Sequence, residues 1–316
     1  MERIWAGLLP AHFLYVPLHA MKETKYYKVA GHVFSVTADV ERFALMQNYV
    51  PFVVHEEAPL FALTVENGEV PDYSEEMHQE DEGQDIFCGK TADGRHVFEF
   101  RWWNETAGAL VCSADYCEGK LITTGHHTKL AIDNALMVLY ALATAVEGTV
   151  LFHAAVVSHE DRAYMFLGPS GTGKSTHAGL WVRHVGGAVL VNDDNPVVRV
   201  FMPSPSGDTP PGEAEMSAVV FGSPWSGKTP CYRNVSYPLG GIVMLSQAPR
   251  NEIRRMGGIE AYASLMASIS GMRWDARIAD GLHRTENDLV SKVPVWHLDC
   301  LPDQAAAELC WESVKG

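Results

Sequence analysis

The chain has 316 residues, of which 47% are hydrophobic and 20% are charged, a composition typical of a folded globular protein long enough for a large core and two domains. Its net charge of -15 at pH 7 argues against a general nucleic-acid-binding surface, because such surfaces need a basic face. Any affinity for phosphate must therefore be supplied locally, by a few residues.

The 6 cysteines are sparse and are not spaced as paired zinc ligands. Cys112 and Cys117 could form a redox pair, but two reduced thiols are the simpler interpretation. No run of about 18 apolar residues is present, so we expect no membrane span. Residues 1–20 resemble a signal peptide only weakly, because prolines interrupt them, and a start of translation at Met21 is an alternative hypothesis.

The first part of the chain, residues 1–125, predicts a small β-rich domain in which no chemistry stands out. The turn signal Asn67-Gly68 follows one predicted strand, and Asp93-Gly94 predicts a hairpin turn between two others. The segments with a β pattern are residues 26–37, 61–66, 86–88, 97–103 and 110–113.

An acidic run at residues 69–85 interrupts this pattern. A metal-binding loop would be one use for it, but a solvated loop is the simpler interpretation, because blocks of like charge repel one another and stay in water. His126 and His127 could also be metal ligands, although a polar lead into the next helix explains them as well.

The second part, residues 126–316, opens with a strongly apolar segment, 129–145, whose helical spacing predicts a packed helix that ends at Gly148. Residues 150–157 then predict one strand. A polar turn follows, and residues 164–167 predict a short buried strand that returns antiparallel to it.

This short strand leads into a glycine-rich stretch with the P-loop (Walker A) form G-x-x-x-x-G-K-[ST], and residues 176–185 predict a helix after it. In such a loop glycines let the backbone N–H groups approach a phosphate closely, and the helix adds its N-terminal partial charge. Lys174 would reach the β- and γ-phosphates, and the Ser175 hydroxyl would hold Mg2+. The residues expected to bind ATP are Gly168, Ser170, Gly171, Thr172, Gly173, Lys174, Ser175 and Thr176.

A second candidate group follows the next predicted strand, 188–191, which ends at Asn192-Asp193-Asp194-Asn195. Carboxylates at the carboxyl end of a strand beside the P-loop strand lie where Mg2+ must be held. A turn cap is the structural alternative for the two aspartates.

The remaining segments alternate between β and helical patterns and contain a second glycine loop at residues 222–228. Lys228 in that loop could contact phosphate or be a solvated turn lysine. The expected elements are a loop at 203–211, strands at 216–221, 239–245 and 293–298, and helices at 259–269, at 275–290 and from 302 onward.

Taken together, these residues resemble the HPr kinase/phosphorylase family and its kinase-like relatives, whose core is similar to that of ATP-dependent phosphoenolpyruvate carboxykinases. The matching pieces are Phe152-His153-Ala154, the stretch from Gly168 to Ser175, and Val191-Asn192-Asp193-Asp194; Arg233-Asn234 is a weaker match. The resemblance covers about residues 150–245. It implies an α/β fold with a P-loop nucleotide-binding core and a mixed sheet, preceded by the smaller β-rich domain.

The resemblance also implies roles for the residues outside the loop. Asp193 would take the proton of an acceptor serine hydroxyl, His153 would lie beside it, Asp194 and Ser175 would hold the metal, and Arg233 would neutralise the transferred phosphoryl group. From the residues alone, His153 fits a core histidine as well as a site residue. The two aspartates also stay unassigned, because a carboxylate tied up as a metal ligand cannot act as a base.

The expected function is thus a cytoplasmic, ATP- and Mg2+-dependent kinase that acts on a hydroxyl of a protein, a peptide or a small molecule, without nucleic acid or membrane as partner. A homo-oligomer is compatible with the sequence. Thr176 stands where an acidic residue often follows the P-loop serine, and the signature linked with dephosphorylation is not found in clear form, so phosphorylase activity and HPr as substrate are not expected. The alternatives are a nucleotide-binding module that recognises a peptide without turnover, and a carboxykinase-like or ATP-hydrolysing enzyme.

Overall fold

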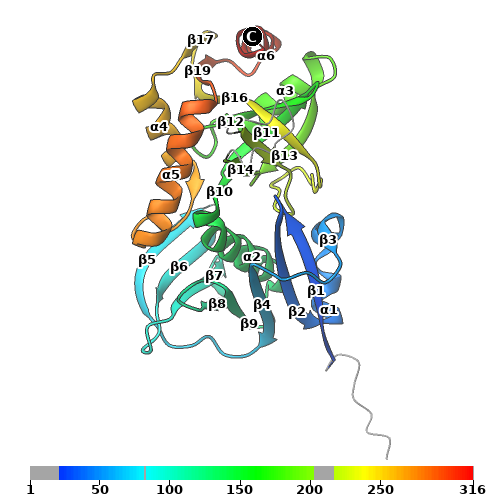
Figure 1. Cartoon of the computed structure of the whole chain (residues 1–316), viewed down its shortest axis with the longest axis vertical. Helices are drawn as coiled ribbons and strands as arrows, with labels where there is room; N and C mark the ends of the chain where they lie inside the picture. The colour runs from blue at the N-terminus through cyan, green and yellow to red at the C-terminus, as the bar shows by residue number, and fades with distance from the viewer. Residues whose placement is uncertain (1–20, 82, 203–216, 316) are drawn as a thin grey trace, which may run out of the picture.

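Two mixed β-sheets, stacked end to end, form the frame of the protein (Figure 1). The structure is a computed structural model and describes residues 21–81, 83–202 and 217–315. The predictions made for residues 1–20 and for the loop at 203–211 lie outside the described residues. In Figure 1 the sheet from the first part of the chain lies below and the sheet from the second part lies above.

The lower sheet has the strand order β3-β1-β2-β4-β9-β8-β7-β6-β5. Its pairs are antiparallel except that β4 runs parallel to both β2 and β9. The strands are β1 (Lys22–Val29), β2 (His32–Asp39), β3 (Val53–Val54), β4 (Phe61–Asn67), β5 (Ser74–Asp81), β6 (Gln84–Lys90), β7 (His96–Trp102), β8 (Glu105–Cys112) and β9 (Glu118–Thr123). The short α1 (Val40–Ala44) and the 3-10 helix η2 (Gln47–Phe52) connect β2 to β3.

Two sequence-based predictions for this sheet are wrong, the single strand at 26–37 and the loop at 69–85. The predicted strand 26–37 is a hairpin, β1–β2, because Ala30 and Gly31 both adopt positive φ (50° and 82°) and reverse the chain. The turn signal Asn67-Gly68 lies at the end of β4, where the sequence predicts it, and the chain forms no hairpin there because both neighbours of β4 are parallel to it. The acidic segment 69–85 contains β5, a strand at the sheet edge, where charged side chains are compatible with solvent.

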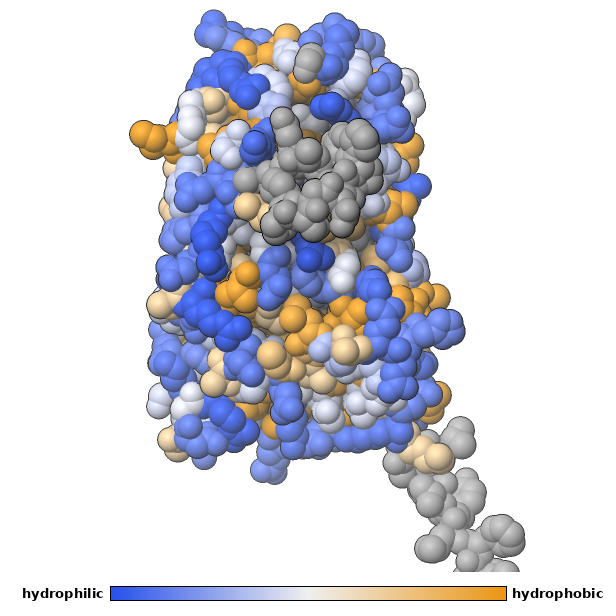
Figure 2. Space-filling model, viewed as in Figure 1, coloured by the Kyte–Doolittle hydropathy of each residue, from blue (hydrophilic) through white to orange (hydrophobic). Residues whose placement is uncertain are grey.

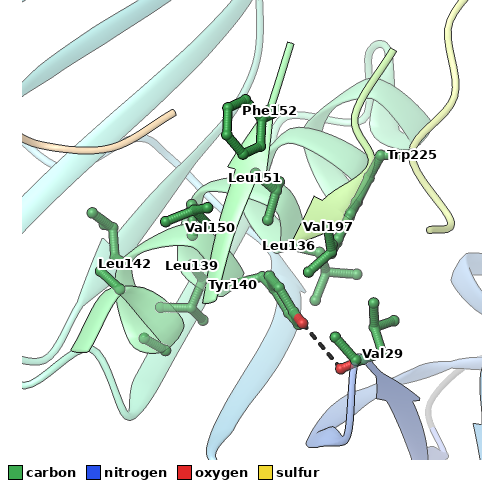
Figure 3. Packing of buried hydrophobic residues seen from close by; sticks show 14 of the residues in the cluster. Val29, Leu136, Leu139, Tyr140, Leu142, Val150, Leu151, Phe152, Val197 and Trp225 are labelled. Carbon is green, nitrogen blue, oxygen red and sulfur yellow. Dashed lines mark hydrogen bonds between the residues drawn. The ribbon is translucent and has the colours of Figure 1, made fainter. Parts of the chain in front are cut away.

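The helix α2 (Thr128–Thr144), which continues into the 3-10 helix η3 (Ala145–Glu147), packs between the two sheets and confirms the helix predicted at 129–145. Figure 3 shows its side chains Leu136, Leu139, Tyr140 and Leu142 against strands of the upper sheet, with the Tyr140 hydroxyl donating to the Val29 carbonyl at 3.0 Å. By length and composition the segment Thr128–Glu147 could cross a membrane, but 61% of its most apolar window is buried inside the protein. Core packing therefore explains its apolar character.

The upper sheet has the order β13-β11-β12-β16-β15-β14-β10-β18, and β19 joins it on β16 with β17 at its outer side. Parallel pairs join β16 to β12 and to β19, and the other pairs are antiparallel. The strands are β10 (Thr149–Phe152), β11 (Ala154–His159), β12 (Arg162–Leu167), β13 (Val189–Asp194), β14 (Val197–Phe201), β15 (Ser217–Phe221), β16 (Ser236–Gln247), β17 (Glu252–Arg255), β18 (Ile269–Ser270) and β19 (Val295–Cys300).

Helices cover both faces of the upper sheet. α3 (Lys174–His184) and α6 (Gln304–Val314) pack with β11, β12 and β16 around Trp181 in one buried cluster. α5 (Ala276–Lys292) packs into a larger cluster that runs without a break from the lower sheet through α2 to the upper sheet, and α4 (Gly258–Met266) lies beside it. The chain thus has an α/β fold with mixed sheets, as predicted, and its largest core joins the two parts of the sequence.

Two details of the upper sheet differ from the prediction. The segment 150–157 is two strands rather than one, because the chain leaves the β14–β10–β18 side at His153 and joins β12 and β13 from Ala154 onward. The strand predicted at 188–191 continues through Asp194, so both aspartates lie within β13 and not after it.

Candidate functional site

The glycine-rich loop, residues 168–173, connects β12 to α3 in the predicted order, and α3 begins directly at Lys174. Gly168, Gly171 and Gly173 have φ values of 148°, 75° and 104°, which residues with a side chain rarely adopt. Around Gly171 a Cβ atom would meet nothing within 4 Å, so this part of the loop faces open space. Backbone conformation, rather than crowding, therefore explains the glycine there.

Two side chains hold the loop in this shape. The Lys174 ammonium, on a residue that is 8% exposed, donates to the carbonyl oxygens of Gly168 at 2.9 Å and Pro169 at 3.2 Å. From the carboxyl end of β16, Gln247 donates its Nε2 hydrogens to the carbonyl oxygens of Gly171 at 3.1 Å and Thr172 at 3.4 Å. Sequence reasoning missed Gln247, although a polar residue just after the predicted strand 239–245 was a usable signal.

Of the four hydroxyl residues in the loop and the first helical turn, three are exposed and Thr172 is half-buried. Ser170, Ser175 and Thr176 are all accessible, and the Thr172 hydroxyl donates within the loop to the Pro169 carbonyl at 2.7 Å. The amino end of an 11-residue helix carries unpaired N–H groups and a partial positive charge. Ligands with negatively charged oxygens fit this end of α3.

The pair Asp193 and Asp194 ends β13, beside β11 and close to His153. Asp194 pairs in register with Ala154, and its Oδ1 lies 3.5 Å from the His153 Nδ1, at the point where the chain passes from one side of the sheet to the other. The two side chains are 35% and 41% exposed, whereas Asp193 is only 4% exposed. His153 therefore accompanies Asp194, and not Asp193 as expected from the resemblance.

The second glycine loop, residues 222–228, lies against β13 and holds this strand end in place. The buried amide of Asn192 donates to the Ser223 hydroxyl and to the Trp225 carbonyl, both at 3.1 Å. The Gly227 N–H donates to the Asp193 carbonyl at 2.7 Å. The backbone positions of both aspartates thus depend on a loop that follows them by about thirty residues.

The other predicted site residues lie farther out. Arg233 is exposed and donates to the Leu190 carbonyl at 2.8 Å, and it does not line the cavity described below. Lys228 is exposed in the second loop. The structure thus brings together the glycine-rich loop, His153 and Asp194, but not Arg233.

A cavity of about 1110 Å³ opens between the glycine-rich loop and the lower sheet. Gly168, Pro169, Ser170, His153 and Asp194 line its upper side. Its lower side is formed by α2 and by β5, β6 and β7, through side chains that include Met77, Phe98 and Met137. Figure 2 shows apolar residues gathered across the middle of the face of the molecule seen in Figure 1, at the level where the two sheets meet.

Within residues 21–81, 83–202 and 217–315, no group of three or more His, Cys, Asp or Glu side chains is placed to hold a metal ion. Mg2+ bound with nucleotide phosphates needs only one or two protein oxygens, and the exposed Ser175 hydroxyl supplies an oxygen of this kind. All six cysteines are free thiols; Cys112 is buried and Cys117 is exposed, in agreement with the reduced interpretation.

No family model matches the chain, and no curated protein matches it. Function is therefore inferred from the residues of the site.

Proposed function

We propose that this protein is an ATP- and Mg2+-dependent kinase that transfers the γ-phosphoryl group to a hydroxyl, as the resemblance to HPr-kinase-like proteins implies. The observation that carries the proposal is one shared cavity. The glycine-rich loop lines it from one strand end, and His153 and Asp194 line it from another. The first residues of the glycine-rich loop and an accessible carboxylate thus face the same space.

The nucleotide phosphates fit the loop side of the cavity. The backbone N–H groups of residues 168–173 and the amino end of α3 favour anionic oxygens. Lys174 lies at the loop through its bonds to the Gly168 and Pro169 carbonyls, and its ammonium would neutralise charge on the β- and γ-phosphates. Bound Mg2+ would neutralise further charge there, and the exposed Ser175 hydroxyl would be one of its ligands.

The acceptor fits the Asp194 side. Phosphoryl transfer forms a bond from the acceptor oxygen to the γ-phosphorus and breaks the bond from that phosphorus to the bridging oxygen, so ADP leaves and the hydroxyl proton must be taken up. Asp194 is accessible from the cavity, and we assign to it the acceptance of this proton, with His153 beside it. Asp193, to which the resemblance gives this role, is buried within β13, and we assign to it a supporting position.

The proposed location is cytoplasmic, because ATP is the donor and the thiols are free.

The test is a transfer assay with [γ-32P]ATP, Mg2+ and candidate acceptors, comparing the unmutated protein with Lys174→Ala and with Lys292→Ala, which changes an exposed lysine at the end of α5. We expect label on an acceptor with the unmutated protein and with Lys292→Ala, and loss of both nucleotide binding and transfer with Lys174→Ala. Release of the label as inorganic phosphate without any acceptor would indicate that the protein is a hydrolase and not a kinase. ATP binding without transfer or hydrolysis would indicate that it is a binding module.

A further inference from the structure

Two sheet edges meet the cavity from opposite sides. β5 is the last strand of the lower sheet, and β18 is the last strand of the upper sheet; within the described part of the chain, β5 pairs only with β6 and β18 only with β10. Met77, Gln79 and Glu80 of β5 line the cavity, as do Ile269 and Ser270 of β18. Each edge carries backbone N–H and C=O groups of the kind that pair with an added strand.

β5 is the longer and more accessible edge. Of its residues, Glu75, Gln79 and Glu80 are exposed, and Figure 1 shows the strand at the outer side of the lower sheet. Among the described residues neither Glu75 nor Glu80 takes part in a salt bridge, whereas Glu76 pairs with Lys90 at 3.4 Å. The edge thus presents carboxylates that complement a basic partner.

An apolar hollow lies immediately beside this edge. Met77 turns toward the core face of the sheet, since it pairs with the buried Cys88, and Phe98 and Met137 line the same cavity. Methionine side chains adapt to apolar groups of different shape. At about 1110 Å³ the cavity is also larger than the roughly 300–1,000 Å³ of most small-molecule sites, so it has room for a peptide segment next to a nucleotide.

We propose that the phosphoryl acceptor is an extended, basic peptide segment that adds a strand to the free edge of β5. Its backbone pairs with β5, its lysine or arginine side chains lie beside Glu75 and Glu80, and an apolar side chain enters the hollow at Met77. The hydroxyl to be phosphorylated then faces Asp194 and the glycine-rich loop across the same cavity. This inference rests on the proposed kinase function and specifies its substrate class.

The first experiment is phosphorylation of an oriented peptide library with a fixed central serine and degenerate flanks. We expect selection of lysine or arginine and of a large apolar residue at flanking positions. Phosphorylation that is indifferent to the flanks would overturn the inference while leaving the kinase intact. Labelling of a small hydroxyl compound without labelling of any library peptide would also overturn the inference while leaving the kinase intact.

Charge variants identify the edge. Glu75→Lys combined with Glu80→Lys should lower kcat/KM for the selected basic peptide by about tenfold or more, because like charges then face each other. The control is Glu41→Lys, an exposed carboxylate on α1 at another part of the sheet, which should change kcat/KM by less than about twofold. Equal effects of the two changes would remove β5 from the binding surface.

Backbone pairing is tested with the peptide itself. In an antiparallel or parallel ladder only alternate amides of the added strand point at the edge. N-methylation along the selected peptide should therefore abolish phosphorylation at every second position and spare the positions between. Loss without this alternation would rule out strand addition.

Failure of the kinase proposal is distinguishable from failure of this one. If no acceptor is labelled at all, a fluorescein-labelled peptide of alternating lysine and leucine around one serine tests docking by anisotropy. Binding that weakens with salt and with the Glu75/Glu80 double change supports the docking edge even without turnover. Absence of binding overturns it.

Discussion

At the scale of single residues, Asp193 and Asp194 show how neighbours in sequence acquire different surroundings. Successive residues of a strand point to opposite faces, so only one of the two can face a given cavity. Asp194 lines the cavity beside His153, whereas Asp193 is buried. A buried carboxylate affects the reaction mainly through the groups packed against it, whereas an accessible carboxylate can contact a substrate directly.

We expect Asp194→Asn to lower kcat by about a hundredfold or more, because a positioned base contributes on the order of 10²–10⁴. Asp193→Asn should lower kcat less than Asp194→Asn does. The measurement is kcat in the transfer assay over a range of Mg2+ concentrations. If Asp194 instead held the metal, Asn at this position would raise the Mg2+ concentration needed for half-maximal rate. The reverse ranking of the two variants would return the catalytic role to Asp193.

A second residue-scale prediction concerns Gln247, whose amide donates to the Gly171 and Thr172 carbonyls. Gln247→Leu removes both bonds while keeping a similar volume, so the loop loses a support that lies outside it. We expect ATP binding to weaken by about tenfold, since each lost bond contributes about 0.5–1.5 kcal/mol. The control is Gln304→Leu at the exposed start of α6. Unchanged ATP affinity in a folded Gln247→Leu variant would show that the loop holds its shape alone.

At the scale of elements, glycines show which contacts define the site. Gly222 begins the second loop, and a Cβ atom there would lie 2.0 Å from the Arg233 carbonyl oxygen. Gly179 lies in α3, where a Cβ atom would meet nothing within 4 Å and φ is ordinary for a helix. The same substitution should therefore have opposite effects at the two positions.

Gly222→Ala should destabilise the fold by about 1–3 kcal/mol, because the backbone of the 222–228 loop must move. Gly179→Ala should stabilise it by about 0.5–1 kcal/mol, because alanine loses less conformational freedom in a helix than glycine does. Urea unfolding of the two variants measures both changes. Since the loop supports the strand end at Asp193 and Asp194, we also expect lower transfer activity in Gly222→Ala but not in Gly179→Ala. A destabilised Gly179→Ala would indicate that α3 is crowded at this position.

At the scale of the whole molecule, buried polar contacts tie the lower sheet to the upper one. His32 of β2 bonds through Nε2 to the Thr149 hydroxyl at 2.8 Å, and Arg199 of β14 donates to the Ala30 carbonyl at 2.8 Å. In the same interface, Trp225 donates to the Tyr49 hydroxyl at 3.0 Å. These bonds lie beside the continuous core and join the two sheets.

His32 makes this interface sensitive to acid. Burial, and then the charge of Arg199, lowers the pKa of His32 to about 4 from 6.5. Below about pH 6.5 the unfolded chain binds a proton that the folded protein excludes, so the free energy of unfolding falls as the pH drops toward 4 and is unaffected by this group above pH 7. Burial also lowers the pKa of His177 in α3 to about 4, which adds a second contribution of the same sign.

We expect His32→Gln, whose amide can still bond to Thr149, to reduce the loss of stability between pH 7.5 and pH 5 by up to about 2 kcal/mol. Chemical unfolding at the two pH values measures this difference. His126→Gln, at an exposed position before α2, is the control and should leave the acid sensitivity unchanged. An identical pH dependence in His32→Gln would mean that this interface does not take part in acid unfolding.

Much of the element order could be predicted because it depends on neighbouring residues. The apolar spacing of α2 and the glycines before Lys174 are local signals, and the structure confirms the helix and the strand–loop–helix order. The hairpin turn at Gly94, with φ of 84°, is also local. Errors arose where an uninterrupted pattern concealed a change of direction, as in the β1–β2 turn, or a change of partner strand, as at His153.

The sequence by itself thus determined the helices and most strands, and it located the residues that suggest phosphate chemistry, because backbone propensity and periodicity act over a few residues. Only the tertiary structure decided that Asp194 and not Asp193 faces the cavity and that Gln247 supports the glycine-rich loop. It also decided that the acidic segment contains β5, which within the described residues is an edge strand across the cavity from this loop. These features depend on contacts between segments far apart in the chain. Burial and strand pairing are properties of such contacts, so no local pattern encodes them.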